Sequence, residues 1–151
     1  MQRATHIPAP EPLDPTRLPQ VLDLLARCGL PQDGLADHVS DVLVAVHDGR
    51  IVGSAAIEHY GDAALLRSVA VDPAWRGQGL GDALVAAVLA HARTRGVADV
   101  YLLTETAADY FARRGFVPVA REAVHPAVTV SLEFTQACPA SAQAMLLKLA
   151  G

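Results

Sequence analysis

Apolar residues recur along this chain with two different periods, and each period marks a different kind of element. In residues 18–25 they return every three or four positions, which is the spacing of one face of a helix. Residues 41–46, 51–60 and 63–71 are short runs dominated by apolar side chains, as in strands that are at least half buried. The pattern predicts one helix that ends near Gly29, followed by three antiparallel strands.

Turn residues separate these strands and end the third one. The Asp-Gly pair at 48–49 is a strong hairpin signal, and the Gly-Asp pair at 61–62 marks a second turn. The Asp-Pro pair at 72–73 stops the third strand. An amphipathic helix is then predicted up to about Arg95, with a broad apolar stripe on one face.

The second half of the chain alternates between strand and helix patterns. A continuous apolar strand over 98–103 suits a parallel or central position in a sheet. The helix after it can be capped by Thr104 or Thr106, and Gly115 closes that helix. The remaining predictions are short strands over 3–7, 116–120 and 144–149, and helices over 31–38 and 126–137.

Strands followed by alternating helices and strands predict an α/β (α+β) fold, with a mixed sheet covered by helices on both faces. The chain has 151 residues, of which 52% are hydrophobic, so it is long enough for one domain over residues 1–151 with a single core.

Charge and composition narrow the classes of partner. The net charge is -4 and the only lysine is Lys148, so nucleic acid is not an expected partner. No apolar run reaches membrane-spanning length and the N-terminus lacks an apolar signal region, so no membrane contact is expected. Cys28 and Cys138 form no C-x-x-C pair. We therefore expect a reducing, cytoplasmic setting and no metal site.

The most informative stretch is the glycine-rich turn between the third strand and the helix after it. Strand, glycine turn and helix N-terminus together favour a bound phosphate, because unpaired backbone N–H groups meet the anion and glycines let it approach. The P-loop pattern fails because no Lys follows Gly81, and the glycine spacing differs from that of a dinucleotide fingerprint. The pattern that fits is Arg-x-x-Gly-x-Gly, formed by Arg76, Gly79 and Gly81.

This motif resembles the pyrophosphate motif of the GNAT acetyltransferase superfamily, and the order of elements over residues 14–149 is similar to that of the family. The resemblance implies a mostly antiparallel sheet that splays apart between its fourth and fifth strands, with acetyl-CoA as cosubstrate in the gap. A second family segment reads Asn-x-x-Ala-x-x-Phe-Tyr-x-x-x-Gly-Phe. Here Ala107, Gly115 and Phe116 match it, whereas Thr104 replaces Asn and Phe111 replaces the usual Tyr.

By that resemblance, the coenzyme-binding residues lie on three segments: the strand backbone that pairs with the pantetheine arm, the turn that cradles the pyrophosphate, and the helix after the fifth strand. The Asp82 side chain should point away from the phosphates, because a carboxylate repels them. The residues implied are Val69, Ala70, Val71, Arg76, Gly77, Gln78, Gly79, Leu80, Gly81, Asp82, Thr104, Ala107 and Phe111.

Acetyl transfer to an amine needs a group that removes the ammonium proton and, optionally, one that protonates the departing thiolate. Glu58, near the end of an apolar strand, is the candidate base, with the alternative that it is a surface residue. His59 faces the opposite side of that strand and is the second candidate. Tyr110, next to the position where the family has Tyr, either donates a proton to the thiolate or only packs.

Arg67 and Ser68 are the candidate acceptor-binding residues. A buried Arg within a strand needs an anion, which is either a carboxylate of this protein or an oxyanion of the substrate. Ser68 should point to the opposite face of the strand.

Residues 64–71 and 134–141, with Glu58 and Gly61, resemble the arsenic-resistance branch of these acetyltransferases. That resemblance implies transfer to the α-amino group of an amino acid with an oxyanion side chain, such as arsinothricin or phosphinothricin. A protein or peptide N-acetyltransferase and a non-catalytic acyl-CoA sensor are the alternatives. Many members form homodimers through their last strands, and the sequence leaves the oligomeric state open.

Overall fold

The computed structural model describes residues 6–131 and 141–149. Within these residues a seven-stranded sheet has the order β1-β2-β3-β4-β5-β7-β6. The strands are β1 (Glu11–Pro12), β2 (Val42–His47), β3 (Arg50–Tyr60), β4 (Ala63–Val71), β5 (Asp99–Thr104), β6 (Val117–Val119) and β7 (Gln143–Lys148). The α-helices are α1 (Leu18–Arg27), α2 (Leu80–Thr94) and α3 (Ala108–Arg113). The 3₁₀ helices are η1 (Pro15–Arg17), η2 (Leu35–Asp41), η3 (Pro73–Trp75), η4 (Arg121–Ala123) and η5 (Val128–Val130).

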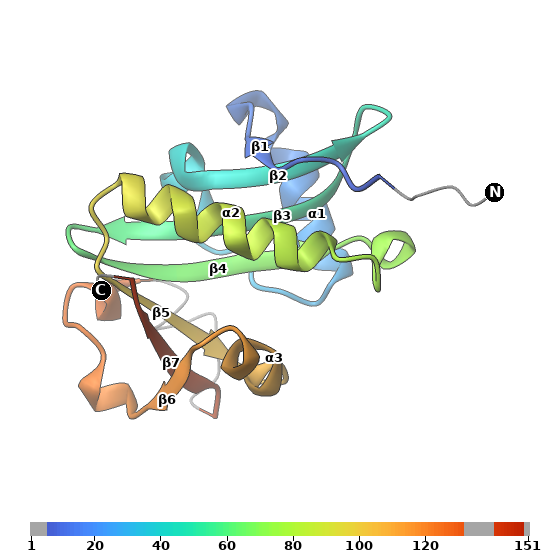
Figure 1. Ribbon diagram of the computed structural model, residues 1–151. Helices are drawn as coiled ribbons and strands as arrows, with labels where there is room; N and C mark the ends of the chain where they lie inside the picture. Colours follow the sequence, from blue (N-terminus) through green and yellow to red (C-terminus); the bar gives the residue numbers. More distant parts are fainter. Residues whose placement is uncertain (1–5, 132–140, 150–151) are drawn as a thin grey trace.

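Helices cover both faces of the sheet, as predicted. Helix α2 lies across one face of β2, β3 and β4, and α1 lies on the other (Figure 1). Alternate residues of β3 divide between the two cores, so that Val52 packs under α2 while Ile51 packs against the α1 side. Helix α2 contributes Leu80, Leu84 and Val88 to its core, each at most 1% exposed.

The first hairpin and the second turn confirm the predictions from sequence. Asp48 and Gly49 both have positive φ, at 50° and 75°, which is the geometry of a type I′ turn. Gly61 also has a positive φ, at 69°. Strand β4 has the predicted bounds, and β3 begins one residue earlier than expected.

Two predicted elements differ from the structure, and a third lies mostly outside its described residues. Of the helix expected over 126–137, the described part forms only η5, because Val128 and Thr129 are poor helix formers; residues from 132 lie outside the described part. The second short helix is η2, displaced from 31–38 to Leu35–Asp41 and interrupted at His38. The strand expected over 3–7 lies mostly outside the described residues, and the edge strand is instead the two-residue β1. Prolines before and within β1 keep it this short.

Strands β4 and β5 pair in parallel over three positions only, Ala63–Leu65 with Asp99–Tyr101. Beyond these positions the strands lose contact, so the later part of each leaves backbone groups unpaired on that side. The sheet therefore splays apart between its fourth and fifth strands, as the family resemblance implied.

A β-bulge in β4 lies beside this gap. Ser54 pairs with Ala70 and Ala56 pairs with Arg67, so Ser68 and Val69 together oppose a single residue of β3. Ser68 has a φ of +60°, and its carbonyl accepts a 2.7 Å hydrogen bond from the Ser54 hydroxyl. The bulge breaks the alternation of side chains along the strand. The prediction that Ser68 points away from Arg67 is therefore wrong: Arg67 Nε donates to Ser68 Oγ at 3.1 Å.

No helix in the described part of the chain is both long and apolar enough to cross a bilayer.

Candidate active site

A cavity of about 720 Å³ occupies the gap between β4 and β5. One wall is the second half of β4 and the other is the end of β5 with the start of α3. The loop after α1 closes a third side. The lining residues that the sequence analysis named are Arg67, Ser68, Val69, Ala70, Val71, Arg76, Gly81, Thr104, Ala107, Tyr110 and Phe111.

The glycine turn forms the rim of the cavity at the N-terminus of α2. Asp72 caps η3, accepting a hydrogen bond from the Ala74 amide at 2.9 Å. Gly77 and Gly79 then take left-handed conformations, with φ of 77° and 88°, which only glycine adopts at little cost. Gly81 adds no such demand, and its neighbours Val71 and Tyr110 would lie 3.6 and 3.9 Å from an added Cβ.

Gln78 and Leu80 of this turn lie beside the cavity and not in its lining, whereas Arg76 is a lining residue. Leu80 is 1% exposed and belongs to the core under α2. Gln78 is exposed, and its side-chain amide donates to the Ala74 carbonyl at 3.4 Å. The Arg76 guanidinium turns back toward β4, donating to the Val71 carbonyl at 3.1 Å and to Cys28 Sγ at 3.5 Å.

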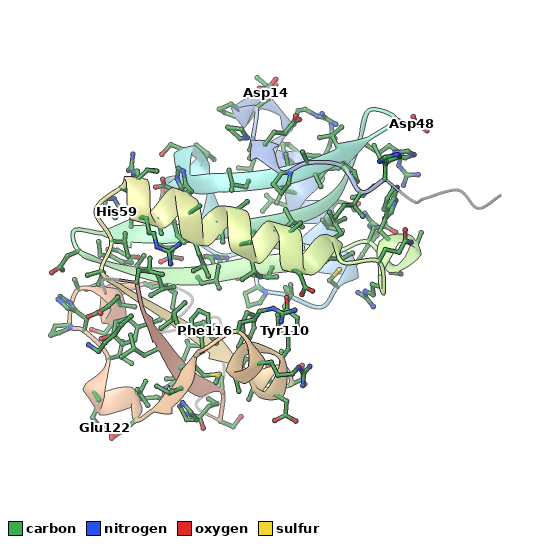
Figure 2. The ribbon with its side chains drawn as sticks, viewed as in Figure 1. Asp14, Asp48, His59, Tyr110, Phe116 and Glu122 are labelled. Carbon is green, nitrogen blue, oxygen red and sulfur yellow. The ribbon has the colours of Figure 1, made fainter. Side chains whose placement is uncertain are left out.

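Asp82, Tyr110 and Arg114 form a cluster that joins the first turn of α2 to α3. The Tyr110 hydroxyl donates to Asp82 Oδ1 at 2.8 Å, and the Arg114 guanidinium forms an ion pair with the same oxygen. Arg114 also lies over the Tyr110 ring, 4.7 Å from its centroid. Figure 2 shows Tyr110 reaching from α3 toward the start of α2.

The charges in this cluster shift each other's pKa. The hydrogen bond from Arg114, followed by that from Tyr110, lowers the pKa of Asp82. Burial raises the pKa of the Tyr110 phenol, and its hydrogen bond to Asp82 raises the pKa further. Asp82 thus stays ionised and Tyr110 stays protonated at neutral pH.

Glu58 and Arg67, predicted separately as base and substrate ligand, form a buried ion pair. Glu58 Oε2 and Arg67 Nη1 are 2.7 Å apart, and their side chains are 1% and 0% exposed. Arg67 also donates to the carbonyls of Asp33 at 2.7 Å and Pro31 at 3.2 Å. Of the two alternatives for Arg67, the structure shows the carboxylate of the protein itself. The alternative of a surface Glu58 is wrong, because its side chain is buried.

Two further side chains complete this network. The Tyr60 hydroxyl donates a short hydrogen bond to Glu58 Oε1, and burial with this hydrogen bond raises the pKa of Tyr60. His38 Nε2 lies 3.8 Å from the same carboxylate oxygen, and the His38 ring meets that of Tyr60 edge-on at 6.0 Å. Because the His38 side chain is 19% exposed, it connects the buried carboxylate with solvent.

The second candidate base, His59, lies away from the cavity. Its Nε2 is 2.7 Å from the Gly61 carbonyl oxygen, and Arg95 Nη2 lies 3.3 Å from its Nδ1. Figure 2 places His59 near the C-terminal end of α2. On the same side of the sheet Asp41, 3% exposed, is 2.7 Å from His91 Nε2.

The start of α3 is fixed by Thr104 and by aromatic packing. Thr104 Oγ1 accepts a hydrogen bond from the Ala107 amide at 2.9 Å, in the turn that precedes α3. The N-cap residue is Ala107 and no side chain caps the helix, so the prediction that Thr104 or Thr106 caps it is wrong. Phe111, 8% exposed, packs edge-on against Phe116 at 5.6 Å. The residue that replaces the usual Tyr therefore belongs largely to the core. Within the described residues, no group of three or more His, Cys, Asp or Glu side chains is arranged to hold a metal ion.

A family model for the acetyltransferase (GNAT) domain matches residues 38–118. The chain belongs to the GNAT acetyltransferase family. The match spans β4, the glycine turn and the end of β5 with α3, which supply most of the cavity lining. The loop after α1, which closes the third side, lies outside the match.

The curated relatives of this GNAT chain include amino-acid acetyltransferases. One, from Mycobacterium tuberculosis, is 39% identical over 90 residues, which are 56% of this chain and 51% of the relative. Another, from Neisseria meningitidis, is 31% identical over 84 residues, 54% of this chain and 19% of the relative. The chain thus spans about half of the relatives' length or less.

Solved structures share the fold over nearly the whole chain. N-acetylglutamate synthase from Neisseria gonorrhoeae, in complex with coenzyme A and N-acetylglutamate, superimposes with a TM-score of 0.80 at 20% identity. That match covers 97% of this chain and 36% of the synthase. A Mycobacterium tuberculosis protein in complex with CoA superimposes with a TM-score of 0.75 at 27% identity, over 94% of this chain and 99% of that one.

Sequence reasoning missed four residues of the site. Tyr60 lies two positions after Glu58, and the two-residue period of a strand could have revealed it. Arg114 lies four positions after Tyr110, where a helix brings side chains together. His38 and Asp33 contribute through an irregular segment, and no periodicity predicts that contact.

Proposed function

We propose that this protein is an acetyl-CoA-dependent N-acetyltransferase whose acceptor is the α-amino group of an amino acid. The observation that supports it most is the splayed β4–β5 pair with the glycine turn at its rim. The β4 backbone at Val69 and Ala70 does not pair with β5, and its open side suits the amides of a pantetheine arm; the Val71 carbonyl already accepts from Arg76. The α2 N-terminus suits a pyrophosphate.

In this reaction the amine nitrogen attacks the thioester carbonyl carbon and the C–S bond breaks. The amine loses one proton and the coenzyme thiolate gains one, so no further reactant is needed. Fixing the thioester along β4 beside the acceptor turns a bimolecular step into a local one. The donors that position it are backbone groups of a strand, which move little.

Glu58 remains the candidate base, acting indirectly. Its carboxylate is buried behind Arg67, so a proton from the amine would pass through a water or hydroxyl before reaching it. His38, at 3.8 Å from Glu58 and partly exposed, offers the exit to solvent.

The acceptor class is supported by the amino-acid acetyltransferases among the relatives. The narrower proposal, an amino acid with an oxyanion side chain such as arsinothricin or phosphinothricin, rests on the positive charge of Arg67 in the cavity wall. Because Glu58 and two carbonyls already engage Arg67, such an oxyanion would have to share that guanidinium or bind the neighbouring Ser68 hydroxyl.

The test measures the release of coenzyme A by thiol titration. The protein is given acetyl-CoA and, in turn, each member of a panel of free amino acids that includes glutamate, phosphinothricin and arsinothricin. Turnover of α-amino acids supports the proposal, and turnover confined to oxyanion side chains supports the narrower one. Acetyl-CoA binding without turnover of any free amino acid, but with turnover of peptides, would replace it with a peptide acceptor. Acetyl-CoA binding without turnover of any amino acid or peptide would favour a non-catalytic acyl-CoA sensor.

A further inference from the structure

Within the Asp82–Tyr110–Arg114 cluster, Tyr110 lines the cavity, while Asp82 and Arg114 lie next to the lining residues Gly81 and Tyr110. A carboxylate beside a phosphate site is unfavourable. Asp82 follows Gly81 directly, in the first turn of α2, and its side chain is 54% exposed. A bare acid there would repel the coenzyme phosphates and so oppose the attraction of the helix N-terminus. The Arg114 guanidinium on Asp82 neutralises that charge.

The Arg114 guanidinium makes a second contact, with an aromatic ring, which an ion pair on the surface does not require. Its guanidinium is stacked on the Tyr110 ring at 4.7 Å, and Tyr110 is itself fixed by a hydrogen bond to Asp82. Tyr110 and Gly81 both line the cavity. The stack therefore holds the guanidinium at the rim with its planar fork pre-oriented, while its side chain remains 32% exposed.

Arg76, the cation that the motif assigns to the pyrophosphate, is engaged on the other side of the turn. It donates to Val71 at the end of β4 and to Cys28 after α1. The two guanidinium groups thus approach the turn from opposite sides, one from the α1 side and one from α3.

We propose that Arg114 is a phosphate ligand of the coenzyme, with Asp82 as its resting partner in the free protein. Binding of the coenzyme exchanges the carboxylate for a phosphate oxygen on the Arg114 fork, and Asp82 keeps its hydrogen bond from Tyr110. This inference rests on the proposed use of acetyl-CoA and assigns a residue outside the glycine motif to the same site. A guanidinium suits phosphate because it donates two parallel hydrogen bonds.

The exchange predicts effects of opposite sign for the two partners. Arg114→Ala removes a charge-assisted ligand, so the dissociation constant of coenzyme A should rise about tenfold or more. Asp82→Asn releases Arg114 and removes the repulsion, so the same constant should fall several-fold. If Asp82 only positioned Arg114, Asp82→Asn would weaken binding instead.

The experiment is calorimetric titration of the full chain with coenzyme A and with dephospho-coenzyme A, which lacks the 3′-phosphate. Arg113→Ala is the matched control, because Arg113 is the exposed neighbour of Arg114 in the same helix. Arg114→Lys keeps the charge but loses the fork, and should lie between wild type and Arg114→Ala. Thermal unfolding of each variant separates lost binding from lost structure.

A loss on Arg114→Ala that is equal for both ligands assigns the contact to the pyrophosphate. A loss that disappears with dephospho-coenzyme A assigns it to the 3′-phosphate. Three outcomes would overturn the inference. The first is that wild type and Arg114→Ala bind coenzyme A equally well, and the second is that Arg113→Ala and Arg114→Ala lose the same affinity. The third is that Asp82→Asn binds coenzyme A more weakly than wild type. Failure of the wild-type protein to bind coenzyme A would instead contradict the proposed function.

Discussion

The two halves of the candidate active site are built in different ways. The coenzyme half is made mainly from backbone: the open edge of β4, the glycine turn and the first turn of α2, all within residues 66–82. The acceptor half is made from side chains that come from distant parts of the chain, since the Arg67 guanidinium joins Glu58 in β3 to carbonyls at positions 31 and 33.

This difference determines how each half can fail. A site made of backbone groups tolerates many side-chain substitutions. It does not tolerate a substitution that changes a glycine conformation or blocks the approach of the ligand to the backbone. A buried charge network depends on every member, because removal of one partner leaves the other without compensation in a medium of low dielectric constant. The first kind of damage should abolish binding with the fold intact, and the second should destabilise the fold itself.

The largest expected effect is in the backbone half. Gly81→Glu places a carboxylate at the N-terminus of α2, and binding of coenzyme A should weaken by about a hundredfold or more, because like charges meet where the pyrophosphate would lie. Gly81→Ala is the control. Its Cβ would lie at ordinary contact distances of 3.6 and 3.9 Å from Val71 and Tyr110, so affinity should be nearly unchanged. Titration of both variants with coenzyme A measures this. Undiminished binding by Gly81→Glu would remove the glycine turn from the site.

In the side-chain half, Arg67→Met should lower the free energy of unfolding by about 3–5 kcal/mol, the typical cost of breaking a buried ion pair by removing one partner. Both charged side chains are at most 1% exposed, so solvent does little to screen the orphaned Glu58. Glu58→Gln should cost a similar amount. The double variant should cost less than the sum, because no unpaired charge remains. Urea unfolding of wild type, the two single variants and the double variant completes a double-mutant cycle. If the two single losses of unfolding free energy simply add in the double variant, Glu58 and Arg67 are not energetically coupled.

The same double variant tests Glu58 as a base. If the fold recovers and the turnover number of the double variant stays about 10²- to 10⁴-fold below that of wild type, while Arg67→Met alone keeps most of its turnover, the carboxylate takes part in proton transfer. If turnover recovers along with the fold, Glu58 serves to hold Arg67 and the loop at 31–33 in place.

The same contrast explains what the sequence could predict. The hairpin at 48–49, the bounds of β4 and the glycine turn follow from residues that are adjacent in the chain, so local signals are sufficient. The pairing of Glu58 with Arg67 was not predicted, although each residue was singled out, because their contact depends on the register between β3 and β4. The bulge at Ser68 shifts that register and reverses the expected direction of one side chain.

Irregular segments were the other source of error. His38 reaches Glu58 from a kinked 3₁₀ helix, and no hydrophobic period describes such a path. The helix expected over 126–137 contains the β-branched residues at 128–130, which have low helix propensity and here form a single 3₁₀ turn. Side-chain contacts between two helices, such as that of Arg114 in the turn after α3 with Asp82 of α2, can be predicted only once the relative position of the helices is known.

A smaller effect is expected at the cap before the glycine turn. Asp72→Ala removes the acceptor for the Ala74 amide, and should lower the free energy of unfolding at pH 7 by about 1 kcal/mol.

The hydrogen bond from Ala74, followed by that from Arg27, lowers the pKa of Asp72 below its usual 3.8. The contribution of the charge is therefore complete above about pH 4, and is lost as the pH falls through the lower pKa of the folded state. Urea unfolding from pH 7 to pH 2 should show the gap between wild type and variant narrowing in that window. A gap that is constant with pH would exclude the carboxylate's charge as its source. Asp72→Asn, which keeps an acceptor, is the control and should lose less at pH 7.

The smallest effect is expected for Tyr110→Phe on the chemical step. The Tyr110 hydroxyl donates to Asp82 at 2.8 Å, so its proton is already engaged with a carboxylate and is not directed at a departing thiolate. The turnover number should therefore change by less than about threefold, while the affinity for coenzyme A changes more, because Tyr110 supports Arg114.

If Tyr110 is the general acid, turnover should instead fall about 10²- to 10⁴-fold. Steady-state rates from pH 6 to pH 10 with saturating acetyl-CoA separate the two outcomes. Phe111→Tyr, which restores the usual family residue at the adjacent position, shows in the same assay whether the site gains from a phenol that faces the cavity.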